Sequence, residues 1–205
     1  MARDTQSIVK MSRREGYALH PKAHKALAKR TALPGQNSQG GFRKKSSQYS
    51  LQLREKQKVK RLYGLLERQF SNLMKEATKS KGQSGHTLLK LLEQRADNVV
   101  YRAGLAPSRR AARQLVTHGH FMLNGKRFDI PSLRLNPGDE LAVRPKSAKS
   151  DYFKRIDDIS PAGETVVSWI SVDRAKLSVK VADVPSREEA ETGINEQLIV
   201  EYYSR

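Results

Sequence analysis

The sequence predicts an α+β protein, in which a mainly helical part carries a smaller module of helices on a small, mostly antiparallel sheet. Apolar residues recur at a helical spacing between residues 50 and 79 and again between 88 and 103. Asn124-Gly125 then separates two short β-prone runs, which is the strongest local indication of a β-hairpin. The first fifty residues are basic and rich in chain breakers, and they predict an extended N-terminal segment.

The N-terminal segment has scattered apolar residues, and residues 34–41 (PGQNSQGG) combine several breakers. A short helix is expected near Pro21 to Arg30. The segment buries too little apolar surface to offset its chain entropy. We therefore expect it to become ordered against a binding partner.

Residues 50–79 are expected to form a helix that carries dense basic charge. The apolar positions at helical spacing are Leu51, Leu53, Val59, Leu62, Leu65, Leu66, Phe70, Leu73 and Met74. The basic positions at its start are Arg54, Lys56, Lys58, Lys60 and Arg61. Glu55 is the sole acidic neighbour there, which favours phosphate contact over a self-neutralised surface. A linker is expected at residues 79–85.

Residues 86–145 predict a compact module of two helices followed by a hairpin and a strand. The first helix runs along the apolar stripe 88–103 and ends at Gly104. The second begins after Ser108, its expected N-cap, and ends at Gly119. The hairpin joins residues 121–123 to 126–128, and a turn at 136–139 precedes a strand at 140–144. The hairpin and strand predict the antiparallel sheet.

Basic residues gather on the second helix and at the hairpin tip of this module. Arg109, Arg110 and Arg113 are expected on an exposed helix face, with Lys126 and Arg127 nearby. Guanidinium groups bind phosphate oxygens through paired hydrogen bonds. This arrangement favours contact with a phosphate backbone over an ordinary solvated helix.

The charge of the whole chain limits the classes of function. Its 205 residues include 39 Lys and Arg against 21 Asp and Glu, a formal net charge of +18. Residues 1–63 carry +13 and 64–150 carry +9, whereas 151–205 carry −4. Such an excess favours a polyanionic partner, and nucleic acid is the best candidate. The sequence has no apolar run long enough to predict a membrane span. The absence of Cys excludes disulfides and Cys-based zinc sites.

No catalytic or metal-binding constellation is apparent. His20 with His24, and His118 with His120, lack nearby carboxylates in a ligand pattern. Asp157-Asp158 is best interpreted as a solvated pair, and no phosphate loop or nucleophile elbow is present. We therefore expect no catalytic residue, no metal and no cofactor.

Six segments resemble a known family over nearly the whole chain. They are KMSRREG at 10–16, PGQ at 34–36, QLREKQKVKR continuing into LYGLLERQF at 52–70, RADNVVYR at 95–102, AARQLV at 111–116 and INEQLIVEYYS at 194–204. This pattern is similar to the bacterial-type family of small-subunit ribosomal protein four. Some members bind zinc through N-terminal cysteines, so this chain resembles the zinc-free type.

The resemblance implies a domain organisation. A basic N-terminal extension covers 1–45, and a helical domain combines 46–90 with 186–205. An α+β domain covers 91–185 and contains the family's RNA-binding module at about 95–157. The resemblance also implies a helix at residues 198–203, where β propensity alone indicates a strand.

The resemblance implies a structural, non-enzymatic protein of the small ribosomal subunit, located in the cytoplasm or in an organelle ribosome. It implies primary binding of rRNA at a multi-helix junction of the 5′ domain, nucleation of body assembly, and an influence on translational accuracy. Implied neighbours are small-subunit ribosomal proteins three and five and the mRNA where it enters the ribosome, with no membrane. The expected RNA-binding residues are Arg3, Lys10, Arg13, Arg14, Arg43, Lys44, Lys45, Arg54, Lys56, Lys58, Lys60, Arg61, Arg109, Arg110, Arg113, Lys126 and Arg127.

Two alternatives come from other classes. Pseudouridine synthases and some tRNA synthetases carry the same module, but an enzyme needs a further catalytic domain, commonly of more than about 100 residues. The chain leaves no room for one, since the module is inserted in a short helical remainder. A free-standing RNA chaperone is the second alternative, and association with small subunits after a salt wash would separate it from a ribosomal protein.

Overall fold

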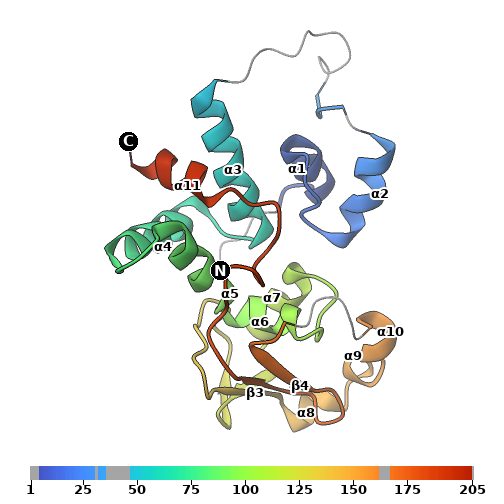
Figure 1. The fold of residues 1–205 in the computed structure, drawn as a ribbon. Helices are drawn as coiled ribbons and strands as arrows, with labels where there is room; N and C mark the ends of the chain where they lie inside the picture. The colour runs from blue at the N-terminus through green and yellow to red at the C-terminus, as the bar shows by residue number, and fades with distance from the viewer. Residues whose placement is uncertain (1–4, 31, 36–46, 162–166, 205) are drawn as a thin grey trace. The chain divides into compact units, whose positions relative to one another are not determined.

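The computed structural model describes residues 5–30, 32–35, 47–161 and 167–204. The chain divides into two compact units (Figure 1). Unit 1 contains Met1–Leu88 and Gly193–Arg205, and unit 2 contains Leu89–Thr192. The boundary runs through one helix, α5 (Ser84–Glu93). None of the helices in the described ranges is long and apolar enough to cross a lipid bilayer.

Unit 1 is helical. Apart from the start of α5, its described helices are α1 (Ile8–Glu15), α2 (Pro21–Lys29), α3 (Gln48–Leu62), α4 (Glu67–Lys79) and α11 (Glu196–Tyr203). The central helix α3 packs against α1 and α11, so segments from both ends of the chain share one core. Val59, Phe70 and Ile199 are fully buried in it. The helix at 198–203 is confirmed as part of α11, and the short helix after Pro21 is confirmed as α2.

The single helix expected at 50–79 is wrong, because the chain breaks between α3 and α4. Gly64 takes a left-handed conformation with φ of +66°. The amide of Leu65 then donates to the carbonyl of Lys60 at 2.9 Å, which closes the end of α3. Leu65 is buried at this corner, so the apolar spacing continues through the break and conceals it in the sequence.

Unit 2 combines short helices with a sheet of five strands. The strands are β1 (Phe121–Leu123), β2 (Lys126–Phe128), β3 (Glu140–Val143), β4 (Ile170–Asp173) and β5 (Ser178–Val181). They follow the order β2-β1-β3-β5-β4, and every neighbouring pair is antiparallel. The remaining helices are α6 (Ala96–Arg102), α7 (Arg109–Thr117), α8 (Pro145–Ala148), α9 (Asp151–Lys154) and α10 (Ile156–Ile159). The α+β class is thereby confirmed.

The core of unit 2 lies between α6, α7 and the sheet. Val99 and Val100 of α6 and Ala112 and Val116 of α7 pack in one cluster with buried strand residues. Phe121 of β1 pairs with Val143 of β3 and packs edge-on against Phe153 of α9. Burial of these side chains fixes α7 on the sheet and so determines which of its faces reaches solvent.

The continuous helix expected over 88–103 is also wrong. Arg95 is extended, with φ of −65° and ψ of 138°, and it separates α5 from α6. The backbone here bonds to a distant segment, since the amide of Ala96 donates to Leu133 at 2.8 Å and that of Leu135 donates to Gln94 at 2.9 Å. These hydrogen bonds take the place of those that a continuous helix from α5 into α6 would have formed.

The local turn and cap predictions of the module are confirmed. The hydroxyl of Ser108 accepts from the amide of Ala111 at 3.3 Å, as an N-cap does. Gly104 and Gly119 both have positive φ at the ends of α6 and α7. Asn124 and Gly125 have φ of 48° and 78°, the conformation that a two-residue hairpin turn needs.

Candidate nucleic-acid interface

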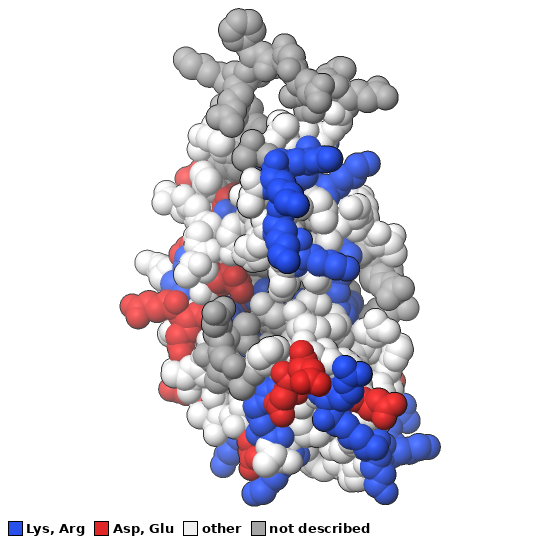
Figure 2. Space-filling view, turned by 90° about the vertical axis from the view of Figure 1, so that its right-hand side faces the viewer, with Lys and Arg blue, Asp and Glu red and all other residues white. Residues whose placement is uncertain are grey.

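Helix α2 presents the most uniformly basic exposed surface of unit 1. Lys22, Lys25, Lys29 and Arg30 are all exposed, and the helix contains no acidic residue. Figure 2 shows blue side chains gathered over the face where α2 lies. None of the four forms an ion pair with another described residue. These residues were not among the expected RNA-binding residues, although a spacing of three and then four residues at 22, 25 and 29 places them on one helix face.

Helix α1 carries three of the expected cations. Lys10 and Arg14 are exposed. Arg13 instead donates from Nη2 to the carbonyl of Ala32 at 2.8 Å, so its guanidinium holds the segment that follows α2. Lys10 and Arg14 are therefore available to an external anion, and Arg13 has a structural contact as well.

The basic residues of α3 have carboxylate partners from other elements. Arg54 and Arg61 both donate to Oε1 of Glu15 on α1, Arg54 at 3.2 Å. The Glu15 side chain is wholly buried. Burial raises the pKa of Glu15 above its ordinary value, and the charges of Arg54 and Arg61 offset part of that rise. Glu15 thus holds two guanidinium groups along α3.

The lysines of α3 are paired as well. Lys56 and Lys60 donate to the two oxygens of Glu67 on α4 at 2.8 and 3.1 Å, and Lys58 donates to Glu55 at 2.7 Å. Burial acts to raise the pKa of Glu67, but hydrogen bonds from Lys56, Tyr203 and Lys60 outweigh it and lower that pKa. Glu55 is the one acidic partner within α3, as expected, but Glu15 and Glu67 from other helices also pair with its cations, so the surface of α3 is more neutralised than its own sequence indicates.

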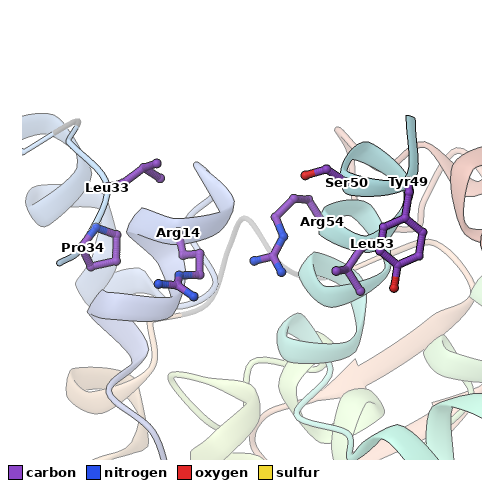
Figure 3. Close-up of a pocket in the computed structure, with 7 residues that line it drawn as sticks. All are labelled: Arg14, Leu33, Pro34, Tyr49, Ser50, Leu53 and Arg54. Atoms are coloured by element: carbon purple, nitrogen blue, oxygen red, sulfur yellow. The ribbon is translucent and has the colours of Figure 1, made fainter. Parts of the chain in front are cut away.

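A hollow of about 420 Å³ lies within unit 1, lined by parts of α1, α3 and the segment after α2 (Figure 3). Its lining residues are Arg14, Leu33, Pro34, Tyr49, Ser50, Leu53 and Arg54. Leu33 and Pro34 stand on one side and Tyr49 and Leu53 on the other, with both guanidinium groups in the space between. The hollow therefore combines apolar walls with positive charge.

In unit 2, two of the three arginines of α7 are engaged inside the fold. Arg109 donates to Asn98 at 2.8 Å and to Glu191 at 2.6 Å, and its guanidinium lies 4.5 Å from the centre of the Tyr101 ring. Arg113 donates to Asp97 at 2.9 Å. Their side chains are only 12% and 14% exposed. The expectation of an exposed face is therefore wrong for these two, because α6 and the chain near Glu191 cover it.

A buried network continues below these arginines. Asp97 also accepts two hydrogen bonds from Arg95, at 3.0 and 2.8 Å. Glu93 accepts from Asn98 at 2.7 Å and from Arg102 through both oxygens at 2.9 Å. All these groups have charged or amide partners, which is the condition under which burial of charge is tolerated. The network fixes α7 relative to α6.

Three of the expected RNA-binding cations of unit 2, at the start of α7 and on the hairpin, are exposed. Arg110, Lys126 and Arg127 are exposed, as the sequence led us to expect. Arg127 lies close to the end of α7, since a Cβ on Gly119 would stand 2.8 Å from its Nε. Arg144, which the sequence analysis did not select, donates to the carbonyl of Gly119 at 3.0 Å.

Two histidines flank Gly119 beside these cations. The rings of His118 and His120 are 6.1 Å apart, and Nδ1 of His120 lies 3.0 Å from the hydroxyl of Ser147. Burial lowers the pKa of His120, and the charges of His118 and Arg144 lower it further. No group of three or more potential metal ligands occurs among the residues that the structure describes.

Four of the expected RNA-binding residues, Arg3, Arg43, Lys44 and Lys45, lie outside the described residues. The others fall into two sets. The first set is exposed: Lys10, Arg14, Arg110, Lys126 and Arg127. The second set is less exposed and has partners within the fold: Arg13, Arg54, Lys56, Lys58, Lys60, Arg61, Arg109 and Arg113.

Comparison with known proteins assigns the family. A model of the ribosomal protein S4/S9 N-terminal domain matches residues 3–93, and a model of the S4 domain matches residues 94–141. The chain is 50% identical over 209 residues to small ribosomal subunit protein uS4 of Chlorobium phaeovibrioides. It is 49% identical to the uS4 of Chlorobaculum tepidum and 48% identical to that of Chloroherpeton thalassium. Each comparison covers 100% of both chains, and so this cysteine-free chain belongs to the uS4 family of small ribosomal subunit proteins.

Proposed function

We propose that this uS4-family chain is a structural constituent of the small ribosomal subunit that binds rRNA through the exposed cations of both units. The family is one of structural proteins, so the alternative of an RNA-modifying enzyme is set aside. The observation that carries the proposal is the net charge of +18, with solvent-facing Lys and Arg on α1, α2, the start of α7 and the hairpin. Such cations bind a phosphate backbone and release its counterions.

The basic residues serve this function in two ways. Those that face solvent contact phosphate directly: Lys10, Arg14, Lys22, Lys25, Lys29, Arg30, Arg110, Lys126 and Arg127. Arg3, Arg43, Lys44 and Lys45 are assigned the same role on the basis of the family resemblance. The paired cations of α3 and the pair Arg109 and Arg113 add positive potential while they hold the neighbouring helices in place.

The proposal extends to the target and to the neighbours. The RNA is a multi-helix junction of the 5′ domain, bound early enough to nucleate assembly of the subunit body. Recognition rests on shape and on phosphate and ribose contacts, as is general for folded RNA. The chain lies beside small-subunit proteins three and five, close to where mRNA enters, and thereby contributes to translational accuracy. Its ribosome is cytoplasmic, with an organelle ribosome as the alternative.

The test is filter binding of the full chain to a small-subunit rRNA 5′-domain fragment across a salt series. Replacing Arg110, Lys126 and Arg127 together with Gln is expected to weaken binding. Three lost phosphate contacts should flatten the log–log salt slope by about 2–2.7 units. Circular dichroism checks that the variant is folded.

The control variant replaces Asp151, Asp157 and Asp158 with Asn, which alters charge at exposed positions of the same unit. It should leave binding unchanged or tighten it slightly. A wild-type slope and affinity in the Arg110 triple variant would overturn the assigned contacts. Loss of the chain from small subunits in a moderate salt wash would instead indicate a free-standing RNA-binding factor.

A further inference from the structure

The hollow lined by Arg14, Leu33, Tyr49 and Arg54 has features of a binding site for one component of the RNA. Its volume of about 420 Å³ falls in the range of about 300–1,000 Å³ that is usual for small-molecule sites. All of its walls belong to unit 1, so its shape is defined within one compact body.

Apolar surface is concentrated at this hollow. The large hydrophobic side chains that are exposed among the described residues are Leu33, Tyr49, Leu51 and Ile130. Leu33, at 60% exposure, and Tyr49, at 48%, both line the hollow, and Pro34 and Leu53 extend its walls. The ring of Tyr202 lies 5.9 Å from that of Tyr49 and supports it from α11. Grouped apolar surface on a charged protein indicates a contact site.

The charge in the hollow is positive and incompletely compensated. Arg14 is exposed and forms no ion pair with another described residue. Arg54 is 37% exposed and donates from Nη1 to Glu15, whose side chain is fully buried and also binds Arg61. Both guanidinium groups point into the space between the apolar walls (Figure 3). Arg14 without an ion pair among the described residues, and Arg54 with a carboxylate that also binds Arg61, favour the approach of an anion.

An aromatic ring beside a pair of arginines matches the chemistry of an unstacked nucleotide. Proteins bind single-stranded RNA bases by stacking them on Tyr or on guanidinium planes, and they bind the adjoining phosphate through Arg. An acidic peptide would satisfy the arginines, but only a nucleotide joins a flat, stackable base directly to the anion that the arginines bind. The observations therefore favour RNA over a protein segment as the occupant.

We propose that the hollow binds one unstacked rRNA nucleotide, with its base against Tyr49 and Leu33 and its phosphate between Arg14 and Arg54. This inference rests on the proposed function, because it requires that the chain binds rRNA. It adds a base-stacking contact to an interface otherwise made by phosphate-binding cations.

The test measures binding of the full chain to the 5′-domain rRNA fragment. Tyr49→Ala should weaken binding by about 5- to 150-fold, the effect of losing one stacked base. It should leave the salt slope unchanged, since no phosphate contact is removed. Tyr49→Phe should bind as the wild type does, because the ring is retained. Arg14→Gln should flatten the slope by about 0.7–0.9 units.

Leu51→Ala is the matched control, because Leu51 lies two residues further along α3, is 44% exposed and does not line the hollow. It should bind as the wild type does. In a second measurement, rRNA containing 4-thiouridine is photocrosslinked to the wild-type chain. The tryptic peptide 46–54 (SSQYSLQLR) should carry the crosslinked nucleotide, and Tyr49→Ala should abolish this product.

Three outcomes would overturn the inference. Unchanged affinity of Tyr49→Ala would exclude stacking, and equal losses for Tyr49→Ala and Leu51→Ala would indicate a general effect on α3. Retained RNA binding by Tyr49→Ala with loss of a contact to another small-subunit protein would assign the hollow to a protein partner. Failure of the wild-type chain to bind the rRNA at all is separate, since it would overturn the proposed function itself.

Discussion

Asp97 and Glu191 determine how the arginines of α7 are used. Each accepts a charge-assisted hydrogen bond from a side chain of α7, Asp97 from Arg113 and Glu191 from Arg109. These carboxylates are 6% and 17% exposed, and each has a second arginine partner, Arg95 for Asp97 and Arg102 for Glu191. Removal of the α7 arginine would leave a poorly solvated charge with part of its compensation lost. Arg110, between them in sequence, is exposed.

Arg109→Gln should therefore destabilise the protein, by about 1–3 kcal/mol, as expected when a largely buried charged group loses the shorter of its two ion pairs. Arg110→Gln should change the free energy of unfolding by no more than about 0.5 kcal/mol, as is usual for a surface substitution. Urea unfolding followed by circular dichroism measures both. Equal stability of the two variants would show that the Arg109–Glu191 pair contributes nothing to the fold.

The sequence identified the cations but not their partners. Arg109 and Glu191 are separated by 82 residues, and Arg54 and Glu15 by 39. Helical spacing reveals only those charged partners that lie a few residues away in the sequence. It therefore predicted that the cations along α3 and α7 are largely unpaired. Helical spacing could have identified the exposed lysines of α2. It could not have identified Arg144, which follows a strand and belongs to no local pattern of basic residues.

At the scale of elements, Gly64 ends α3 and allows α4 to begin in a new direction. Its φ of +66° is a conformation that residues with a Cβ adopt only with strain, yet a Cβ there would meet no atom within 4 Å. A substitution at this position thus tests the backbone conformation alone.

Gly64→Ala should lower the free energy of unfolding by about 1–2 kcal/mol, the cost of a left-handed conformation for an L-residue. Gly64→Asn should cost less, since Asn tolerates this conformation better. Chemical denaturation of the two variants beside the wild type provides the measurement. An alanine variant as stable as the wild type would mean that α3 and α4 can join through another turn.

Helices α2 to α7 and the first three strands could be predicted from local pattern, because caps, apolar spacing and the Asn124-Gly125 turn act over a few residues. Helices α1, α8, α9 and α10 were not predicted, and α11 was expected only from the family resemblance, because its local pattern indicates a strand. The breaks at Gly64 and Arg95 could not, since the apolar spacing continues across both. Strands β4 and β5 were also missed. Each has only four residues. The turn between them places Leu177 at φ of +52°, and a leucine does not predict this left-handed conformation.

At the scale of the whole molecule, a net charge of +18 acts in two distinct ways. It attracts any polyanion at long range, an effect that depends on total charge and is screened by salt. It also permits contacts at defined phosphates, an effect that depends on where each cation lies. Figure 2 shows that red side chains interrupt the blue over the lower part of the view, where acidic residues of α9 and α10 lie, whereas blue predominates over α2.

Two variants with the same change in net charge separate these effects. Replacing Lys22, Lys25 and Lys29 of α2 with Gln removes three exposed charges from a helix without acidic residues. Replacing Lys154, Lys176 and Lys180 removes three exposed charges from the acidic C-terminal part of the sequence. Gln is about as good a helix former as Lys, so α2 should remain helical.

The α2 variant should flatten the log–log salt slope of rRNA binding by about 2–2.7 units, because three phosphate contacts are lost. The Lys154 variant should keep the wild-type slope and show only a small decrease in association rate at low salt, since it reduces long-range attraction but removes no contact. Filter binding across a salt series gives the slopes, and stopped-flow association at low and high salt gives the rates. If both variants flatten the slope equally, binding follows total charge, and α2 is not a contact surface. If only the α2 variant does so, the three replaced lysines bind defined phosphates, and the acidic part of the chain lies away from the RNA.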